Sequence, residues 1–179
     1  MKTSTLIIAA ILYLSSSSEK KITGTISYDK HKYESIEHAH LLIKSGNKTV
    51  ESIRIDSNGH FQIQRYFTQD LDLFFMAIGG PPTYLVTIRR DSPDSLDLNL
   101  TLPVVYKKNI EKVICPKCGK TDRIIPISYG FKEIILTGYT SEDGITYYSS
   151  DKGHLYHDGG CMENAFSPQW YCKRDKLEF

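Results

Sequence analysis

Short apolar runs alternate with turn-forming residues from residue 22 to residue 102, and no convincing helical period appears there. In the last run, leucines at every second position alternate with polar residues, which predicts one buried and one solvated face. Short strands at this spacing are typical of a β-sandwich. We therefore expect a mainly β fold, with strands over residues 22–28, 41–43, 50–55, 61–66, 71–78, 84–88 and 96–102.

Asn58-Gly59 lies between the third and fourth expected strands. Both residue types accept the positive φ that tight hairpin turns require. Ile53 and Ile55 precede the turn with a period of two, and an apolar pair with the same period follows it. The pattern predicts a β-hairpin that places four apolar side chains on one face of the ladder.

The first segment has the plan of a secretory signal peptide. Lys2 gives a positive start, residues 6–14 form an unbroken apolar run, and serines occupy positions 15–18, which is the order found in such signals. The run is shorter than the roughly twenty apolar residues of a membrane span. We expect a signal at 1–18 and an exported chain, periplasmic or secreted and associated with the cell envelope, with no transmembrane span. A buried N-terminal helix is the alternative.

Three motifs over residues 19–103 carry a resemblance: G-T-I at 24–26, A-x-L at 39–41 and D-x-N-G-x-F-x-I at 56–63. This segment resembles the carboxypeptidase regulatory-like, or transthyretin-like, domain. That family often has a proline before the alanine of its second strand, where this chain has Glu37-His38. The resemblance implies a β-sandwich that serves as an exported accessory module for scaffolding or binding, because function resides in sites and not in the fold.

The C-terminal segment, residues 104–179, contains all four cysteines. Cys115-Pro-Lys-Cys118 can grip one tetrahedral ion from a single tight turn, and Gly119 supplies the backbone angle that lets amides point at sulfur. Cys161 and Cys172 complete an all-sulfur set, with 42 residues between Cys118 and Cys161. Four protein ligands leave no position for water, so the expected site is a structural zinc.

Two other ligand sets remain open, and so do two roles for the cysteines that need no metal. In one set Asp175 replaces Cys161, and in the other His157 is recruited. Two structural disulfides would also use four cysteines and would suit an oxidising compartment. Thiol-redox chemistry through Cys115 and Cys118 comes after structural zinc and structural disulfides. Redox Cys-x-x-Cys motifs normally open a helix after a strand, whereas the residues after Cys118 are typical of a turn and a strand.

Four short elements in this segment carry a second resemblance: C-P-K-C-G at 115–119, P-I-x-Y-G at 126–130, G-G-C at 159–161 and W-Y-C at 170–172. Together they resemble zinc-ribbon-like cysteine domains of small bacterial proteins. The resemblance implies a small β-rich domain, and it carries no activity.

Composition and motifs narrow the functional classes. The chain has 22 basic and 21 acidic residues, for a net charge of +1, so it lacks the basic excess of general nucleic-acid binders. No H-E-x-x-H or G-x-S-x-G motif occurs. We expect a non-enzymatic module whose partner is a protein or an envelope component. The alternatives are a thiol enzyme, a metal enzyme using His154 and His157, or a regulatory subunit of a larger exported enzyme. His38 and His40 have the spacing of a two-ligand metal site, but ordinary surface histidines are the simpler interpretation.

Overall fold

The structure is a computed structural model, and it describes residues 19–30, 36, 38–102, 108–109, 112–130, 137–142, 144–149 and 155–179. Every regular element in these ranges is a strand, which confirms the mainly β prediction. The strands are β1 (Glu19–Tyr28), β2 (His40–Ser45), β3 (Lys48–Arg54), β4 (His60–Tyr66), β5 (Leu71–Met76), β6 (Thr83–Ile88), β7 (Ser95–Leu102), β8 (Lys108–Asn109), β9 (Lys112–Val113), β10 (Ile124–Ser128), β11 (Thr137–Thr140), β12 (Thr146–Ser149), β13 (Leu155–Asp158), β14 (Trp170–Cys172) and β15 (Leu177–Glu178).

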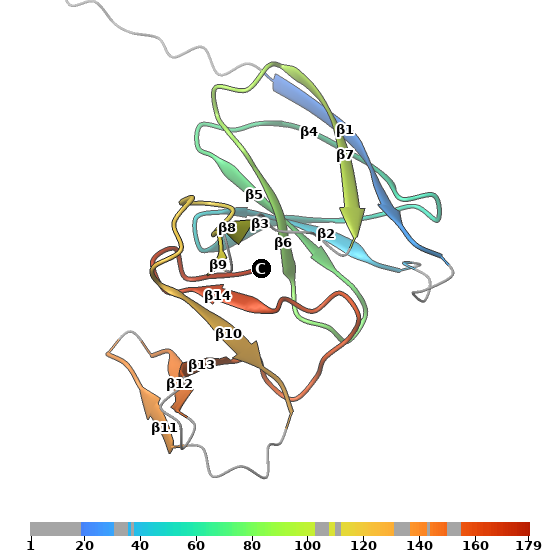
Figure 1. Cartoon of the computed structure of the whole chain (residues 1–179). Helices are drawn as coiled ribbons and strands as arrows, with labels where there is room; N and C mark the ends of the chain where they lie inside the picture. The colour runs from blue at the N-terminus through green and yellow to red at the C-terminus, as the bar shows by residue number, and fades with distance from the viewer. Residues whose placement is uncertain are drawn as a thin grey trace, which may run out of the picture.

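The first seven strands form two sheets around one apolar core (Figure 1). One sheet has the order β4-β1-β7 and the other β3-β2-β5-β6. Strand β1 pairs antiparallel with β4 and parallel with β7. Alternate residues of each strand point inward, as the period of two predicts, and the seven predicted strands all occur. The innermost side chains are those of Ile22, Ile26, Leu41, Ile43, Ile63, Leu73 and Phe75.

The turn at Asn58-Gly59 does not close a hairpin, so that prediction is wrong. Strand β3 lies in the four-stranded sheet, whereas β4 pairs with β1 in the other sheet. Of the two turn residues, Gly59 alone has a positive φ, of 87°. A Cβ at Gly59 would lie 2.1 Å from the Ile26 carbonyl oxygen. The glycine is required because the turn crosses between the sheets against the backbone of β1. The apolar residues on both sides still reach the same core.

Strand β5 explains why residues 71–76 are almost continuously apolar. Its Leu71, Leu73 and Phe75 face the core between the two sheets. Its Phe74 faces outward and belongs to a second core, shared with Tyr84 of β6 and with the C-terminal half of the chain. A strand buried on both faces needs apolar residues at successive positions.

The C-terminal strands form a six-stranded sheet of order β11-β12-β13-β10-β14-β15, and β8 pairs with β9. Figure 1 shows this half lying against the outer face of the β3-β2-β5-β6 sheet. The second core joins Phe74 and Tyr84 to Val113, Leu177 and Phe179, among other residues. Phe166 reaches in the other direction and packs edge-on against Phe75 in the first core, with ring centroids 5.4 Å apart.

Several predictions lie outside the described residues: the signal at 1–18, the boundary at 103–104, Glu37 and His154. The described part of the chain contains no helix that is long and apolar enough to cross a membrane.

Candidate metal centre

The first cysteine turn follows β9 and has the form of a metal knuckle. The backbone N–H groups of Lys117 and Cys118 donate to the sulfur of Cys115. The N–H of Gly119 donates to the Cys115 carbonyl at 2.9 Å, and Gly119 has φ 70°. The prediction that this glycine provides an unusual backbone angle is confirmed, and the amides that point at sulfur would stabilise a thiolate.

A second turn, between β14 and β15, repeats this geometry. The N–H groups of Arg174 and Asp175 donate to the sulfur of Cys172. Lys176 occupies the position that Gly119 has in the first turn, and its φ is also positive, at 49°. A non-glycine residue in this conformation is uncommon. The second turn is thus a Cys-x-x-Asp copy of the first Cys-x-x-Cys turn, with a carboxylate in place of the last sulfur.

The two turns bring together one possible ligand atom from each of Cys115, Cys118, Cys172 and Asp175, all within 4.8 Å of one another. The sulfurs of Cys118 and Cys172 are 3.9 Å apart, and Asp175 Oδ2 lies 3.1 Å from the sulfur of Cys115 and 3.3 Å from that of Cys172. Two sulfurs on one tetrahedral zinc are about 3.8 Å apart, given Zn–S bonds of about 2.3 Å. A disulfide requires about 2.05 Å, so the spacing fits metal ligands and not a bonded pair.

The buried groups of the cluster differ in protonation when no metal is bound. Burial raises the pKa of the Cys115 thiol and that of the Cys172 thiol. Burial also acts to raise the pKa of Asp175, but hydrogen bonds from the thiols of Cys118, Cys115 and Cys172 outweigh it, and the pKa is lowered. Without a cation the protonated thiols of Cys115 and Cys172 therefore lie beside an ionised Asp175. A divalent ion would replace the shared protons, since metal binding requires thiolates.

Cys161, the fourth predicted ligand, is exposed and lies outside this cluster. The structure thus brings together three of the four residues in the favoured set, and the fourth member of the cluster is Asp175 from the second set. His157 is also outside the cluster, because its Nε2 contacts Glu178 Oε1 at 2.8 Å. A carboxylate three positions after Cys172, matching the spacing of the first pair, is the sequence signal that indicates this residue.

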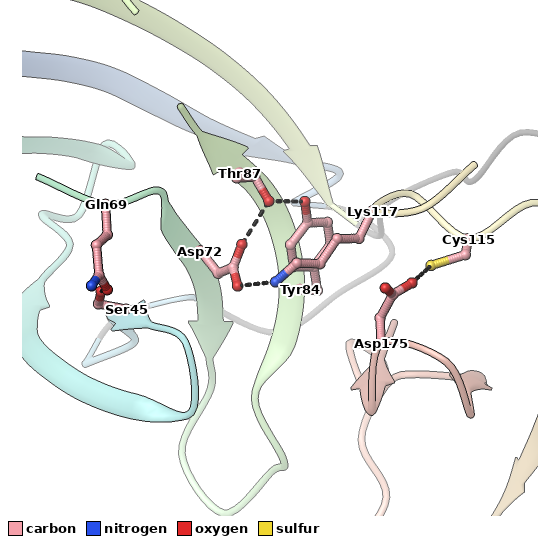
Figure 2. Close-up of polar contacts among 8 residues, drawn as sticks. All are labelled: Ser45, Gln69, Asp72, Tyr84, Thr87, Cys115, Lys117 and Asp175. Atoms are coloured by element: carbon pink, nitrogen blue, oxygen red, sulfur yellow. Dashed lines mark hydrogen bonds and ion pairs between the residues drawn. The ribbon is translucent and has the colours of Figure 1, made fainter. Parts of the chain in front are cut away.

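Contacts between the turns and the rest of the chain hold the cluster in place. Figure 2 shows Lys117, between the two cysteines of the first turn, reaching the carboxylate of Asp72 on β5. Lys117 Nζ lies 2.6 Å from Asp72 Oδ2, and Thr87 donates to the other oxygen at 2.6 Å. Arg174 of the second turn binds both oxygens of Asp122, three residues after the first turn, at 2.8 and 3.1 Å. Sequence reasoning missed the Asp72 contact, although a charge inside an apolar strand signals a partner.

His38 and His40 have ordinary partners. The guanidinium of Arg54 donates to His38, and His40 Nδ1 lies 3.1 Å from the Ser52 hydroxyl. His38 precedes β2 with a positive φ of 68°, so His38 and His40 do not sit on one extended strand. Among the described residues, the cysteine cluster is the one group of three or more potential ligands.

No family model matches the chain. No curated protein matches it. Among solved structures, the crystal structure of a DUF3823 family protein from Parabacteroides merdae ATCC 43184 is similar, with a TM-score of 0.35 and 13% identity. The match covers 74% of this chain and 56% of that chain. A likeness of this size says nothing about the site or the function.

Proposed function

We propose that this protein is an exported, non-enzymatic binding module in which one structural zinc fastens a C-terminal ribbon onto a β-sandwich. The observation that carries the metal is the cluster of Cys115, Cys118, Cys172 and Asp175, whose ligand atoms all lie within 4.8 Å of one another. Thiolate and carboxylate ligands in a tetrahedral arrangement are typical of zinc.

A closed site suits a structural role. All four positions of a tetrahedral ion would be filled by protein, which leaves none for a substrate or an activated water. The cluster also lies beside the second core, which includes Cys115 and Cys172 themselves. An ion there would stabilise a half of the chain whose own strands are short.

The binding role rests on the family resemblance of residues 19–103 and on the shape of the sandwich as a platform. We place the division of the chain at 103–104, with the transthyretin-like part before it and the ribbon after it. Export rests on the signal-like pattern at residues 1–18. A partner protein or an envelope component is the expected target.

Thiol-redox catalysis is the rival from another class. A reactive cysteine needs an accessible sulfur with a lowered pKa. Cys115 is 0% exposed, and burial raises the pKa of its thiol. The first turn also continues into β10 and not into a helix. The burial of Cys115 and the strand that follows the turn argue against a redox nucleophile.

The test is elemental analysis of the purified chain, combined with a count of reactive thiols before and after chelation. We expect one zinc per chain, with one reactive thiol in the native protein and four after denaturation in chelator. Asp175→Ala should lose metal, whereas Cys161→Ser should retain it and remove the one reactive thiol. Metal lost with Cys161→Ser but kept with Asp175→Ala would restore the all-sulfur set. No metal and no free thiols would establish disulfides and overturn the proposal.

A further inference from the structure

A cavity of about 350 Å³ lies between the outer face of the β3-β2-β5-β6 sheet and the C-terminal sheet. It is separate from the cysteine cluster, and none of the four clustered residues lines it. Ligand pockets in proteins typically measure about 300–1,000 Å³ and are often found where two structural units meet. We call it the inter-sheet cavity.

The walls of the inter-sheet cavity combine charged and apolar side chains and include two aromatic rings. Phe74 of β5 lines it from the sandwich, and Tyr171 and Leu177 line it from the C-terminal sheet. These three residues are 7%, 3% and 4% exposed, so they are held by packing and present fixed surfaces. Rigid aromatic walls favour a flat apolar ligand over a flexible chain.

The charged groups of the cavity favour an anion. Its lining contains the cations Lys44 and Lys176 and the single carboxylate Glu178. The ammonium of Lys44 lies 4.3 Å from the centre of the Phe74 ring, and the described part of the chain offers it no carboxylate partner. It is therefore placed at an apolar wall, where it can pair with an incoming negative charge.

The single carboxylate in the cavity lining, that of Glu178, already has a partner. His157 Nε2 lies 2.8 Å from Glu178 Oε1, and the imidazole is stacked on Tyr171 with ring centroids 3.8 Å apart and an interplanar angle of 9°. His157 is 8% exposed. This arrangement fixes Glu178 in place, and the two lysines of the lining, Lys44 and Lys176, outnumber it and set the charge preference of the cavity.

We propose that the inter-sheet cavity binds a small aromatic carboxylate, with its ring lodged among Phe74, Tyr171 and Leu177 and its carboxylate paired with Lys44. The proposal deepens the binding role proposed above by naming a ligand class, and it does not depend on which metal the cysteine cluster holds.

The experiment is calorimetric titration of the full metal-loaded chain with 2-naphthoate and with its neutral isostere 2-naphthamide. We expect one 2-naphthoate per chain, bound more tightly than the amide. Lys44→Met should weaken naphthoate binding by about fivefold to tenfold, the scale of one charge-assisted contact, and should leave the amide unchanged. Lys48→Met removes a lysine that does not line the cavity and is the matched control.

A blocking variant tests the location. Pro82 lies at the cavity wall in the segment just before β6, and Pro82→Trp should abolish binding of both probes if the thermal midpoint and zinc content stay normal. No saturable binding of naphthoate to the native chain, or equal affinities for naphthoate and amide that Lys44→Met leaves unchanged, would overturn the proposal. Zinc is measured in the same samples, so that the two proposals can fail separately. Metal-free protein that still binds naphthoate would contradict the zinc proposal alone. Zinc-loaded protein that binds no naphthoate would contradict the cavity proposal alone.

Discussion

The ammonium of Lys117 lies 2.6 Å from the carboxylate of Asp72, joining the first cysteine turn to the central strand of the sandwich. The side chain of Asp72 is only 7% exposed, whereas that of Lys117 is 38% exposed. The pair is therefore asymmetric: without its partner the lysine could turn to water, but the carboxylate would stay buried with the Thr87 hydrogen bond and no positive charge beside it.

This asymmetry predicts unequal effects for the two halves of the pair. Lys117→Gln should lower the free energy of unfolding by about 2 kcal/mol, less than for a fully buried pair because the lysine is partly solvated. Asp72→Asn should cost less than Lys117→Gln, and the double variant should recover part of the loss. Denaturant titration of the four proteins at matched zinc content measures this coupling, and strictly additive effects would contradict it.

The paired turns predict opposite effects at equivalent positions. Lys176 has φ 49° and Gly119 has φ 70°, and a side chain in this region costs about 1–2 kcal/mol. Gly119→Ala should therefore destabilise the chain by about 1 kcal/mol, since a Cβ there meets no atom within 4 Å and adds only backbone strain.

Lys176→Gly should be neutral or stabilising by less than about 1 kcal/mol, because relief of the strain is offset by greater freedom of the unfolded chain. Thermal denaturation of both variants would show the contrast. A clear loss of stability in Lys176→Gly would mean that the lysine side chain, and not the backbone, holds the second turn.

The crossing turn at Gly59 predicts a large effect of a single methyl group. Gly59→Ala would place a Cβ 2.1 Å from the Ile26 carbonyl oxygen at φ 87°, so it should lower the free energy of unfolding by about 3 kcal/mol or more. Gly46→Ala is the matched control, because Gly46 has φ 59° and no atom within 4 Å of a Cβ. It should cost only about 1 kcal/mol. Equal costs in denaturant titration would show that the close approach to β1 is unimportant.

Asp56 in the same turn predicts a pH dependence. Backbone N–H groups of His60 and Asn58 donate to its carboxylate at 2.8 and 2.9 Å, and these bonds, led by that from His60, hold its pKa below the ordinary value of 3.8. A lowered pKa contributes stability above the unfolded value, and that contribution is lost as the pH falls through the folded pKa. The stability difference between the native protein and Asp56→Asn should therefore shrink below pH 3.8. A difference that grew in acid would contradict this sign.

The sandwich strands were predictable because burial on one face imposes a period of two that is local in sequence. The hairpin at Asn58-Gly59 was not, since the same turn residues serve both a hairpin and a crossing between sheets. The choice depends on the partner of β4, which is β1, more than thirty residues earlier in the chain. Local patterns do not encode such non-local pairing.

The metal cluster was predictable in part. The first turn follows from Cys115-x-x-Cys118 and Gly119, but the choice between Cys161 and Asp175 depends on which residue the fold carries to the cluster. Ligand chemistry alone favours sulfur, whereas spacing from Cys172 favours the carboxylate. The ion pair of Asp72 with Lys117 joins residues 45 positions apart in the sequence, so no local pattern could predict it.

The sharing of the second core between the two halves has a consequence for the order in which the chain is made. Phe74 and Tyr84 are covered by Leu177 and Phe179, and Cys115 meets Asp175 across a separation of 60 positions. A sandwich that has emerged from the ribosome thus carries an open apolar face until residues 172–179 follow. Residues 172–179 supply two ligands and this cover together, so a chain made only as far as the sandwich exposes an apolar face that favours association until that segment is added.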